Sequence, residues 1–332
     1  MRNGALMEVK NVKKLYAYKR GLRDSIFGSR FFVRAVDDVS FHIEKAGILG
    51  LAGESGCGKT TIGRLLVHLE RPTEGKIELN GADTVSLGGR ELRSFRKATQ
   101  MIFQDPYQAM NPRFTVYNIV SEPLIVHKIV TTKEESIEMA TKMLERAGLK
   151  PAVKYLNRYP YELSGGEKQR VTIARAMILH PQFVVADEPV SMLDVTVRAG
   201  IMNLLLRLKK EFEIAYLFIT HDLSVARYMC QEGRLAIMYL GKIFEIGPTE
   251  KIILDPLHPY TKLLLSAVPI PDPALSRRAR ASARGAISGP LDFPSGCRFH
   301  PRCPNAINKC KEIEPNLKIA GKDHYVACSC ID

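Results

Sequence analysis

A glycine-rich segment in the first quarter of the chain has the residues needed to bind phosphate. It runs Gly53-Glu54-Ser55-Gly56-Cys57-Gly58-Lys59-Thr60, with Thr61 next, and fits the P-loop pattern between an apolar strand and a helix. Its glycines let backbone N–H groups close around phosphate oxygens, and the helix start adds partial positive charge. Lys59 suits the β and γ phosphates of a nucleotide, and the Thr60 hydroxyl suits Mg²⁺. The segment predicts a nucleotide site; a chance glycine-rich turn is the alternative.

Two adjacent acids end the apolar run from Phe183 to Ala186. This is the shape of a Walker B strand, in which Asp187 holds Mg²⁺ and Glu188 activates water for attack on phosphate. An apolar strand that ends in two acids is common by itself. Because the glycine-rich segment lies upstream, the two patterns together predict hydrolysis of a nucleotide.

The segment Leu163-Ser164-Gly165-Gly166-Glu167 lies just before that strand. Here the chain resembles the ABC ATPase family. The resemblance implies that Ser164, Gly165, Gly166 and Glu167 begin a helix that contacts the γ-phosphate of ATP held by a partner subunit, through hydroxyl, backbone and helix dipole. It also implies that two subunits sandwich two nucleotides, so that a monomer is nearly inactive. A Ser-Gly-Gly linker is the alternative.

Other positions match the family in the expected order. Gln104 matches the residue that touches Mg²⁺ and the attacking water. The segment from Ser191 to Asp194 matches the D-loop, except for a methionine where alanine is usual. His221 matches the histidine that orients the γ-phosphate and water, although a lone histidine is more often structural. Tyr16 stands where the family stacks an aromatic ring on adenine, and Tyr18 is the rival. The predicted catalytic residues are Glu188, His221 and Gln104.

The chain after the nucleotide motifs narrows the resemblance. His258-Pro259-Tyr260-Thr261 and the segment 264–273 are similar to the C-terminal extension of ATPases from the dipeptide/oligopeptide importer group. Cys57 inside the glycine-rich segment also occurs in that group. The resemblance runs from Val9 to Cys328. It implies a second, homologous ATPase subunit, two integral membrane permease subunits and, indirectly, an extracytoplasmic solute-binding protein.

Five of the seven cysteines crowd into the last 36 residues. Cys297, Cys303, Cys310 and Cys328, with five, six and seventeen residues between them, match four cysteines that ligate a [4Fe–4S] cluster in the importer group. The spacings lack the paired C-x₂-C knuckles of a zinc ribbon, which favours iron–sulfur over zinc. Structural zinc and free thiols remain alternatives, and Cys330 can replace Cys328 in either site.

The elements that must position these residues predict an α/β fold. We expect strands at 8–12 and 33–43, then a strand at 47–52 and a helix at 59–68 around the glycine-rich turn, and strands at 76–79 and 99–103. Helices such as 132–147 form a subdomain at about 105–165, inserted into a P-loop core of mostly parallel strands at 183–187, 214–220 and 235–246. The predicted domains are an ATPase domain, 1–255, with an N-terminal antiparallel β subdomain, and a Cys-rich extension, 256–332.

Composition and charge set limits on the function. No apolar run approaches the length of a membrane helix, and residues 1–10 lack the core of a secretory signal, so the expected location is peripheral, on the cytoplasmic face of the cell membrane. The formal charge of +13 favours anionic partners, but no stretch combines clustered Arg and Lys with aromatics as a single-strand groove would. We therefore expect no nucleic acid partner. Soluble ABC ATPases that act on ribosomes or DNA remain the alternative class, and importers of nickel, glutathione or oligosaccharides the alternative substrates.

Overall fold

The computed structural model describes residues 4–18, 31–267 and 293–331. Residues 268–273 of the segment 264–273, which carries part of the resemblance to the importer group, lie outside these residues. The chain forms two compact units, each assembled from separate segments. The first comprises Met1–Leu6, Ile43–Gly47 and Ser86–Phe218, and the second comprises Met7–His42, Ile48–Val85 and Ile219–Asp332.

A four-stranded sheet accounts for the start of the second unit. Its strands are β1 (Ala5–Tyr18), β2 (Phe31–Glu44), β4 (Glu74–Leu79) and β5 (Ala82–Asp83), in the order β2-β1-β4-β5. The β1–β4 and β4–β5 pairs are antiparallel, with Val9 opposite Ile77. Met7 and Val9, two positions apart, are buried on one face of β1, and Leu6 and Val12 are buried as well, with a register shift between Lys10 and Lys13. The antiparallel β subdomain is thus confirmed.

The second unit also contains the strands that carry the glycine-rich segment. They follow the order β11-β12-β10-β9-β3, where β3 is Ile48–Ala52, β9 Arg234–Tyr239, β10 Lys242–Pro248, β11 Lys318–Gly321 and β12 His324–Val326. Strand β3 is parallel to β9, whereas β10 is antiparallel to both β9 and β12. The predicted single run 235–246 is a hairpin, because Leu240 and Gly241 both have positive φ, at 42° and 85°, and reverse the chain.

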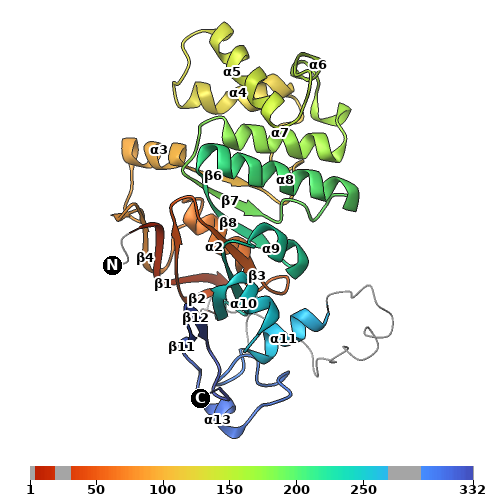
Figure 1. Ribbon diagram of the computed structural model, residues 1–332. Coiled ribbons are helices and arrows are strands. Elements are labelled where there is room, and N and C mark those ends of the chain that lie inside the picture. Colours follow the sequence, from red (N-terminus) through yellow and green to blue (C-terminus); the bar gives the residue numbers. More distant parts are fainter. Residues whose placement is uncertain (1–3, 19–30, 268–292, 332) are drawn as a thin grey trace. The chain divides into compact units, whose positions relative to one another are not determined.

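The C-terminal extension belongs to the core of this unit. Its strands β11 and β12 extend the sheet beside β10 near the C-terminus (Figure 1). One buried cluster joins Ile237 and Tyr239 of the sheet to Tyr260, Phe299 and the cysteines Cys297 and Cys310. The helices of the unit are α2 (Lys59–Leu66), α9 (Leu223–Met229), α10 (Thr249–Leu254), α11 (Pro259–Ser266) and α13 (Asn308–Glu312). The predicted helix 59–68 stops at Leu66, because His68 takes a left-handed conformation at φ 57°.

Three strands lie at the centre of the first unit, in the order β8-β7-β6. They are β6 (Thr99–Ile102), β7 (Phe183–Asp187) and β8 (Ala215–Thr220), the last of which ends just beyond the unit. Strands β6 and β7 are parallel, with Met101 opposite Val185. Every residue of β7 and β8 is buried, which is typical of parallel strands covered on both faces.

The first unit also contains the predicted helices. They are α3 (Gly89–Ala98), α4 (Val116–Val126), α5 (Lys133–Arg146), α6 (Val153–Leu156), a 3₁₀ turn (Pro160–Glu162), α7 (Gly165–Met177) and α8 (Val195–Phe212). Helices α4, α5 and α7 lie side by side (Figure 1). The helix predicted at 132–147 is α5, which is capped by Thr132, whose hydroxyl accepts from Glu135 N, and is followed by Gly148 at φ 85°. Across the described ranges, no helix is long and apolar enough to cross a bilayer.

Candidate functional site

The glycine-rich segment forms the connection between β3 and α2. Two of its glycines are required by the backbone: Gly53 has φ 155° and Gly58 has φ 108°. A Cβ atom on Gly53 would lie 2.1 Å from the Met238 carbonyl oxygen, and one on Gly58 would lie 2.1 Å from the Ala35 carbonyl oxygen. Only glycine fits these positions, because another residue would meet both steric overlap and an unfavourable φ. Neighbouring backbone therefore fixes the shape of the loop.

Lys59 folds back across this loop. Its side chain is buried, and Nζ donates to the carbonyl oxygens of Gly53 at 2.8 Å and Glu54 at 2.9 Å. The residue that caps α2 is Gly58, which has no side chain to accept hydrogen bonds from the first-turn N–H groups. Cys57 belongs to the loop and its side chain is buried, and this burial raises the pKa of its thiol. The loop thus surrounds an ammonium group and ends at a helix start, which is an arrangement suited to phosphate.

The C-terminal extension contacts this loop directly at Glu54. Arg302 donates to both carboxylate oxygens, NH1 to Oε2 at 2.9 Å and NH2 to Oε1 at 2.9 Å. The backbone N–H of Glu54 donates to the Tyr260 hydroxyl at 3.0 Å. From the sequence, Glu54 is predicted only as a member of the loop, and neither partner is predicted. The only sequence signal was the position of Arg302 between two of the clustered cysteines.

Three more predicted residues lie in the second unit. Tyr16 and Tyr18 are both partly exposed on β1, so exposure does not distinguish the predicted adenine-stacking residue from its rival. The Tyr16 hydroxyl donates to Glu70, and burial together with this carboxylate raises the Tyr16 pKa to about 12. His221 directly follows β8 and is exposed. Asp222, the next residue, caps α9 by accepting from Ser224 N at 2.8 Å.

Gln104 and Glu188 meet in the first unit, although 84 positions separate them. Gln104 Nε2 donates to Glu188 Oε2 at 3.1 Å. Asp187 is buried at the end of β7, and Glu188 follows it at φ 45°. A left-handed conformation in a non-glycine residue costs about 1 kcal/mol and concentrates at functional sites. The amide and the carboxylate thus form one polar pair beside the end of β7.

The segment Ser164–Glu167 starts α7 with a capping box. The Ser164 hydroxyl accepts from Glu167 N at 3.4 Å, and Glu167 Oε2 accepts from Ser164 N at 2.8 Å. The backbone N–H of Ser164 lowers the pKa of the Glu167 carboxyl, aided by the Ser164 hydroxyl. Ser164 and Gly165 are exposed, so the helix start faces outward. The prediction that this segment begins a helix is confirmed.

The D-loop segment continues from Glu188. Ser191 Oγ donates to the Glu188 carbonyl oxygen at 3.0 Å, and Arg198 Nε donates to the Leu193 carbonyl oxygen at 2.8 Å. Met192, the residue that departs from the family pattern, is 62% exposed. The loop is therefore held by its backbone, while its unusual side chain points to the surface.

The cysteines of the extension approach one another without forming a ligand set. Cys297, Cys310 and Cys328 are buried, Cys303 is half-buried and Cys330 is exposed. The sulfur atoms of Cys310 and Cys330 lie 3.7 Å apart, while Cys328 Sγ accepts from Cys330 N at 3.4 Å. Burial raises the thiol pKa of Cys297 to about 11. In the described part of the chain, no three His, Cys, Asp or Glu side chains are arranged to bind a metal, so the structure does not support the predicted [4Fe–4S] cluster.

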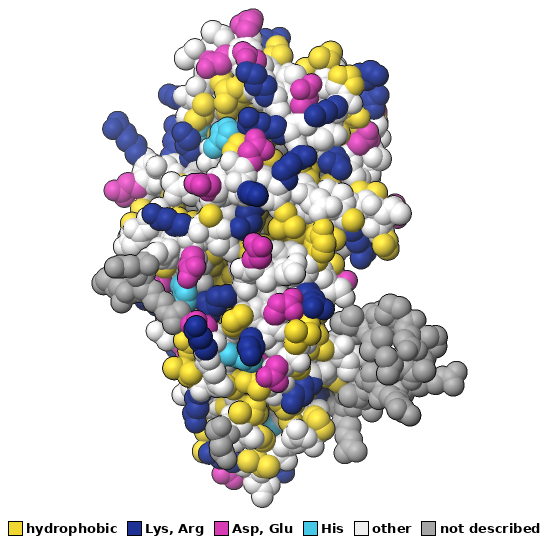
Figure 2. Space-filling model, in the orientation of Figure 1, with side chains coloured by type: hydrophobic (Ala, Val, Ile, Leu, Met, Phe, Trp, Pro, Cys, Tyr) yellow, Lys and Arg dark blue, Asp and Glu magenta, His cyan; other side chains and the backbone are white. Residues whose placement is uncertain are grey.

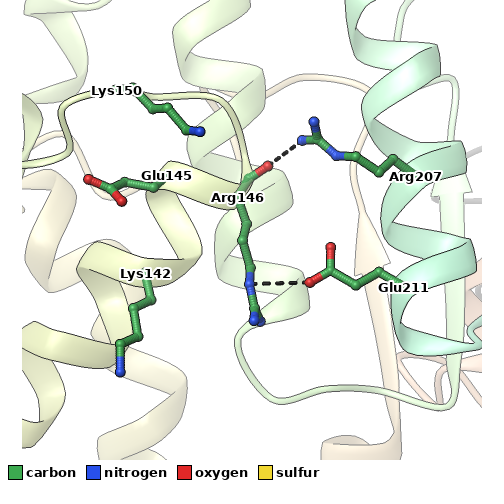
Figure 3. A pocket seen from close by; sticks show the side chains of 6 residues that line it. All are labelled: Lys142, Glu145, Arg146, Lys150, Arg207 and Glu211. Carbon is green, nitrogen blue, oxygen red and sulfur yellow. Dashed lines mark hydrogen bonds and ion pairs between the residues drawn. The ribbon is translucent and has the colours of Figure 1, made fainter.

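A separate cavity of about 380 Å³ lies between α5 and α8 in the first unit (Figure 3). Its lining is charged, and two of the charges are paired: Arg146 Nε lies 3.3 Å from Glu211 Oε1, while Arg207 NH2 donates to the Arg146 carbonyl oxygen. None of the predicted nucleotide residues lines it.

The charged side chains of the surface are mixed. On the face in view in Figure 2, Lys and Arg side chains are spread among acidic and apolar ones.

Helix α7 presents the Ser-Gly-Gly start, which is the segment that carries the resemblance to the ABC ATPase family, at the surface. The family model described as ABC transporter matches residues 36–191, and the model described as oligopeptide/dipeptide transporter, C-terminal region, matches residues 244–310. The fold and the site therefore define an ATP-binding cassette, and the chain is an ABC ATPase.

Curated relatives place it more narrowly. The oligopeptide transport ATP-binding protein AppF of Bacillus subtilis (strain 168) is 45% identical over 325 residues, which cover 97% of this chain and 96% of that protein. The probable peptide ABC transporter ATP-binding protein y4tS of Sinorhizobium fredii is 42% identical, covering 98% and 89%. A dimeric cassette solved in a post-hydrolysis state with ADP and Pi, MJ0796, matches with a TM-score of 0.63 and 29% identity, covering 73% and 98%. The chain belongs to the ATP-binding subunits of the oligopeptide/dipeptide transporter family.

Proposed function

We propose that this ABC ATPase powers an importer of dipeptides or oligopeptides. The observation that carries the proposal is the pairing, in one chain, of a complete cassette with an extension that matches the oligopeptide/dipeptide transporter C-terminal region. Relatives of nearly equal length, named as oligopeptide or peptide transport ATP-binding proteins, support the same substrate class.

The glycine-rich loop holds the phosphates in this proposal. Backbone N–H groups of Gly56 and Gly58 and the start of α2 receive phosphate oxygens, and Lys59 exchanges its two carbonyl partners for the β and γ phosphates. Thr60, Gln104 and Asp187 are the residues that would hold Mg²⁺, which would neutralise charge on the phosphates. An aromatic ring of β1, from Tyr16 or Tyr18, stacks on adenine.

Hydrolysis needs a water molecule placed against the γ-phosphate. Glu188 polarises this water, and its hydrogen bond from Gln104 holds the carboxylate in place. His221 orients the γ-phosphate from the end of β8. Ser164, Gly165 and Gly166 contact the ATP of a facing subunit, because the start of α7 is exposed and carries the helix dipole. Two ATPase subunits therefore enclose two nucleotides between them.

The dimer works on membrane partners. Closing on ATP and reopening after hydrolysis drives two integral permease subunits, which receive peptide from an extracytoplasmic solute-binding protein. Near-complete switching requires about 5.5 kcal/mol of differential affinity, which two nucleotide sites can supply. We place the chain peripherally at the cytoplasmic face of the membrane, with an ATPase domain at 1–255, a helical insertion at 105–165 and the extension at 256–332.

The [4Fe–4S] assignment stays a prediction that rests on the resemblance of the four cysteines to those of the importer group. The approach of Cys310 and Cys330 sulfurs to 3.7 Å supports a shared site, although the arrangement is not that of a ligand set. Iron and acid-labile sulfide, measured on protein purified without oxygen, test it. About four iron and four sulfide ions per chain would support the cluster, and the finding of neither would contradict it.

Glu188→Gln tests the proposed chemistry. We expect ATP hydrolysis to fall about 10²- to 10⁴-fold while ATP still binds, because the amide cannot accept a proton from water. Glu138→Gln on the exposed face of α5 is the matched control and should retain full activity. Mass spectrometry of what co-purifies from membranes then tests the function class. Two membrane subunits and peptide-stimulated hydrolysis support the importer, whereas ribosomes or nucleic acid, or activity that survives Glu188→Gln, would contradict it.

A further inference from the structure

One loop of the extension reaches into the nucleotide-binding loop. It is the segment Cys297–Cys303, and Arg302 stands at its end. Its guanidinium makes two parallel hydrogen bonds to Glu54, both at 2.9 Å, with side chains that are only 8% and 23% exposed. Such bidentate pairs fix geometry as well as charge. The pair joins residues that are 248 positions apart, the second residue of the P-loop and the last but one of the cysteine-bounded loop.

The same P-loop residue is also held through its backbone. Glu54 N donates to the hydroxyl of Tyr260, a fully buried residue of α11. The Tyr260 ring lies 4.6 Å from that of Tyr239 and 5.3 Å from that of Phe299, and the Tyr239 hydroxyl accepts from Arg302 at 3.2 Å. Packed aromatic rings therefore fix the position of Arg302 as well as that of its acceptor.

The charge on Glu54 makes this contact relevant to ATP. A carboxylate in a loop that must receive phosphates repels the ligand, and the repulsion is strong where solvent screening is incomplete. Arg302 neutralises that charge and holds the carboxylate in an ion pair. Without the guanidinium, Glu54 would lose the anchor of its side chain and the loop its charge balance, and of the two contacts with the extension only the Tyr260 hydrogen bond would remain.

We propose that Arg302 is a positioning residue for ATP binding, which holds and neutralises Glu54 so that the C-terminal extension sets the ATP affinity of the P-loop. The inference rests on the proposed role of Gly53 to Thr60 as the ATP site. It assigns the extension a part in the nucleotide cycle through residues outside the loop motif.

The test separates charge from structure. In the full chain, Arg302→Gln should raise the KM and Kd for ATP about tenfold with a smaller change in kcat, because binding rather than hydrolysis loses its support. Glu54→Gln combined with Arg302→Gln removes the repulsive carboxylate as well, and should recover most of the affinity. Arg302→Lys keeps the charge without the forked guanidinium, and its KM for ATP should lie between those of the wild type and Arg302→Gln.

Arg298→Gln is the matched control. Arg298 lies in the same loop, is also buried and donates to Asp37, Glu314 and the Leu240 carbonyl oxygen instead of the P-loop. We expect a lowered melting temperature with an ATP KM within about twofold of the wild type.

Three results would overturn the inference: an unchanged ATP KM in Arg302→Gln, a double variant no better than the single one, or an equal KM increase in Arg298→Gln. If Arg302→Gln fails to fold, the double variant and Arg302→Lys decide. Lys59→Ala tests the assigned nucleotide site separately from Arg302, because ATP binding that survives this change refutes that site itself.

Discussion

Glu245 is the residue whose removal we expect to destabilise the second unit most. It lies on β10, and its carboxylate is fully buried. Oε1 accepts from Leu257 N at 2.8 Å and lies 2.8 Å from His324 Nε2. Oε2 accepts from His258 N at 3.0 Å and from the Thr261 hydroxyl. One side chain therefore fastens the strand to the start of α11 and to β12.

The cost of substitution follows from these four partners. Glu245→Ala leaves two backbone N–H groups, a hydroxyl and an imidazole without an acceptor, and we expect a loss of about 3–5 kcal/mol, as for other broken buried networks. In Glu245→Gln, the Thr261 hydroxyl or His324 can turn to accept from the new amide. One backbone N–H, of Leu257 or His258, must still face an N–H₂ group, so the expected loss is about 1–3 kcal/mol.

Urea unfolding of the wild type and the two variants measures the difference. Hydrogen exchange at the Leu257 and His258 amides reports the local effect, because these N–H groups lose their acceptor directly. Glu250→Ala, which removes an exposed partner of Arg227, is the control and should cost less than about 1 kcal/mol. A Glu245→Ala variant as stable as the control, or unchanged exchange at both amides, would show that the carboxylate does not fasten these segments.

Three further outcomes follow from the second unit. Burial lowers the His258 pKa to about 3, whereas the histidine of the unfolded chain keeps its usual pKa of about 6.5, so only the unfolded chain takes up this proton between pH 7 and pH 5. The free energy of unfolding should therefore fall by about 2 kcal/mol from pH 7 to pH 5. His258→Asn, which can still cap α11, should lose less when urea unfolding is measured at the two pH values. Gly58→Ala should abolish ATP binding in a nucleotide-binding assay, because its Cβ would overlap the Ala35 carbonyl oxygen, whereas Gly56→Ala, with open space around the new Cβ, should bind ATP more weakly but measurably. Cys57 should resist alkylation until urea unfolds the chain, because it is buried and burial raises its thiol pKa; peptide mass spectrometry checks this.

The sequence predicted those features that depend on neighbours along the chain. Ser164 and Glu167 stand three positions apart, which is the spacing of a capping box, and the structure forms that box. The apolar run 183–186 predicted a strand that the structure buries, and the helix predicted at 132–147 is α5. In each case the signal is a short pattern whose physical cause, a cap or a buried face, acts within one element.

The features that the sequence did not reveal depend on contacts between distant segments. In the sequence, Glu245 is one polar position in an apolar strand, and no neighbouring residue predicts its partners at 257–261 and 324. Strand β12 is only three residues long and acquires its place by pairing with β10. The resemblance to the importer group implied a ligand set of four cysteines that the described side chains do not form, since the spacing of cysteines limits but does not fix where their sulfur atoms meet.

The proposed contact between Arg302 and Glu54 has a consequence in the opposite direction. Binding linkage is reciprocal: if the extension raises ATP affinity through this pair, ATP must stabilise the pair by the same factor. ATP should therefore slow hydrogen exchange across the Cys297–Cys303 loop in the wild type. The slowing should be lost in the double variant that lacks both charged groups, although that variant still binds ATP. Equal slowing in both proteins would mean that ATP reaches the loop by another route, and the reciprocal argument for Arg302 would fail.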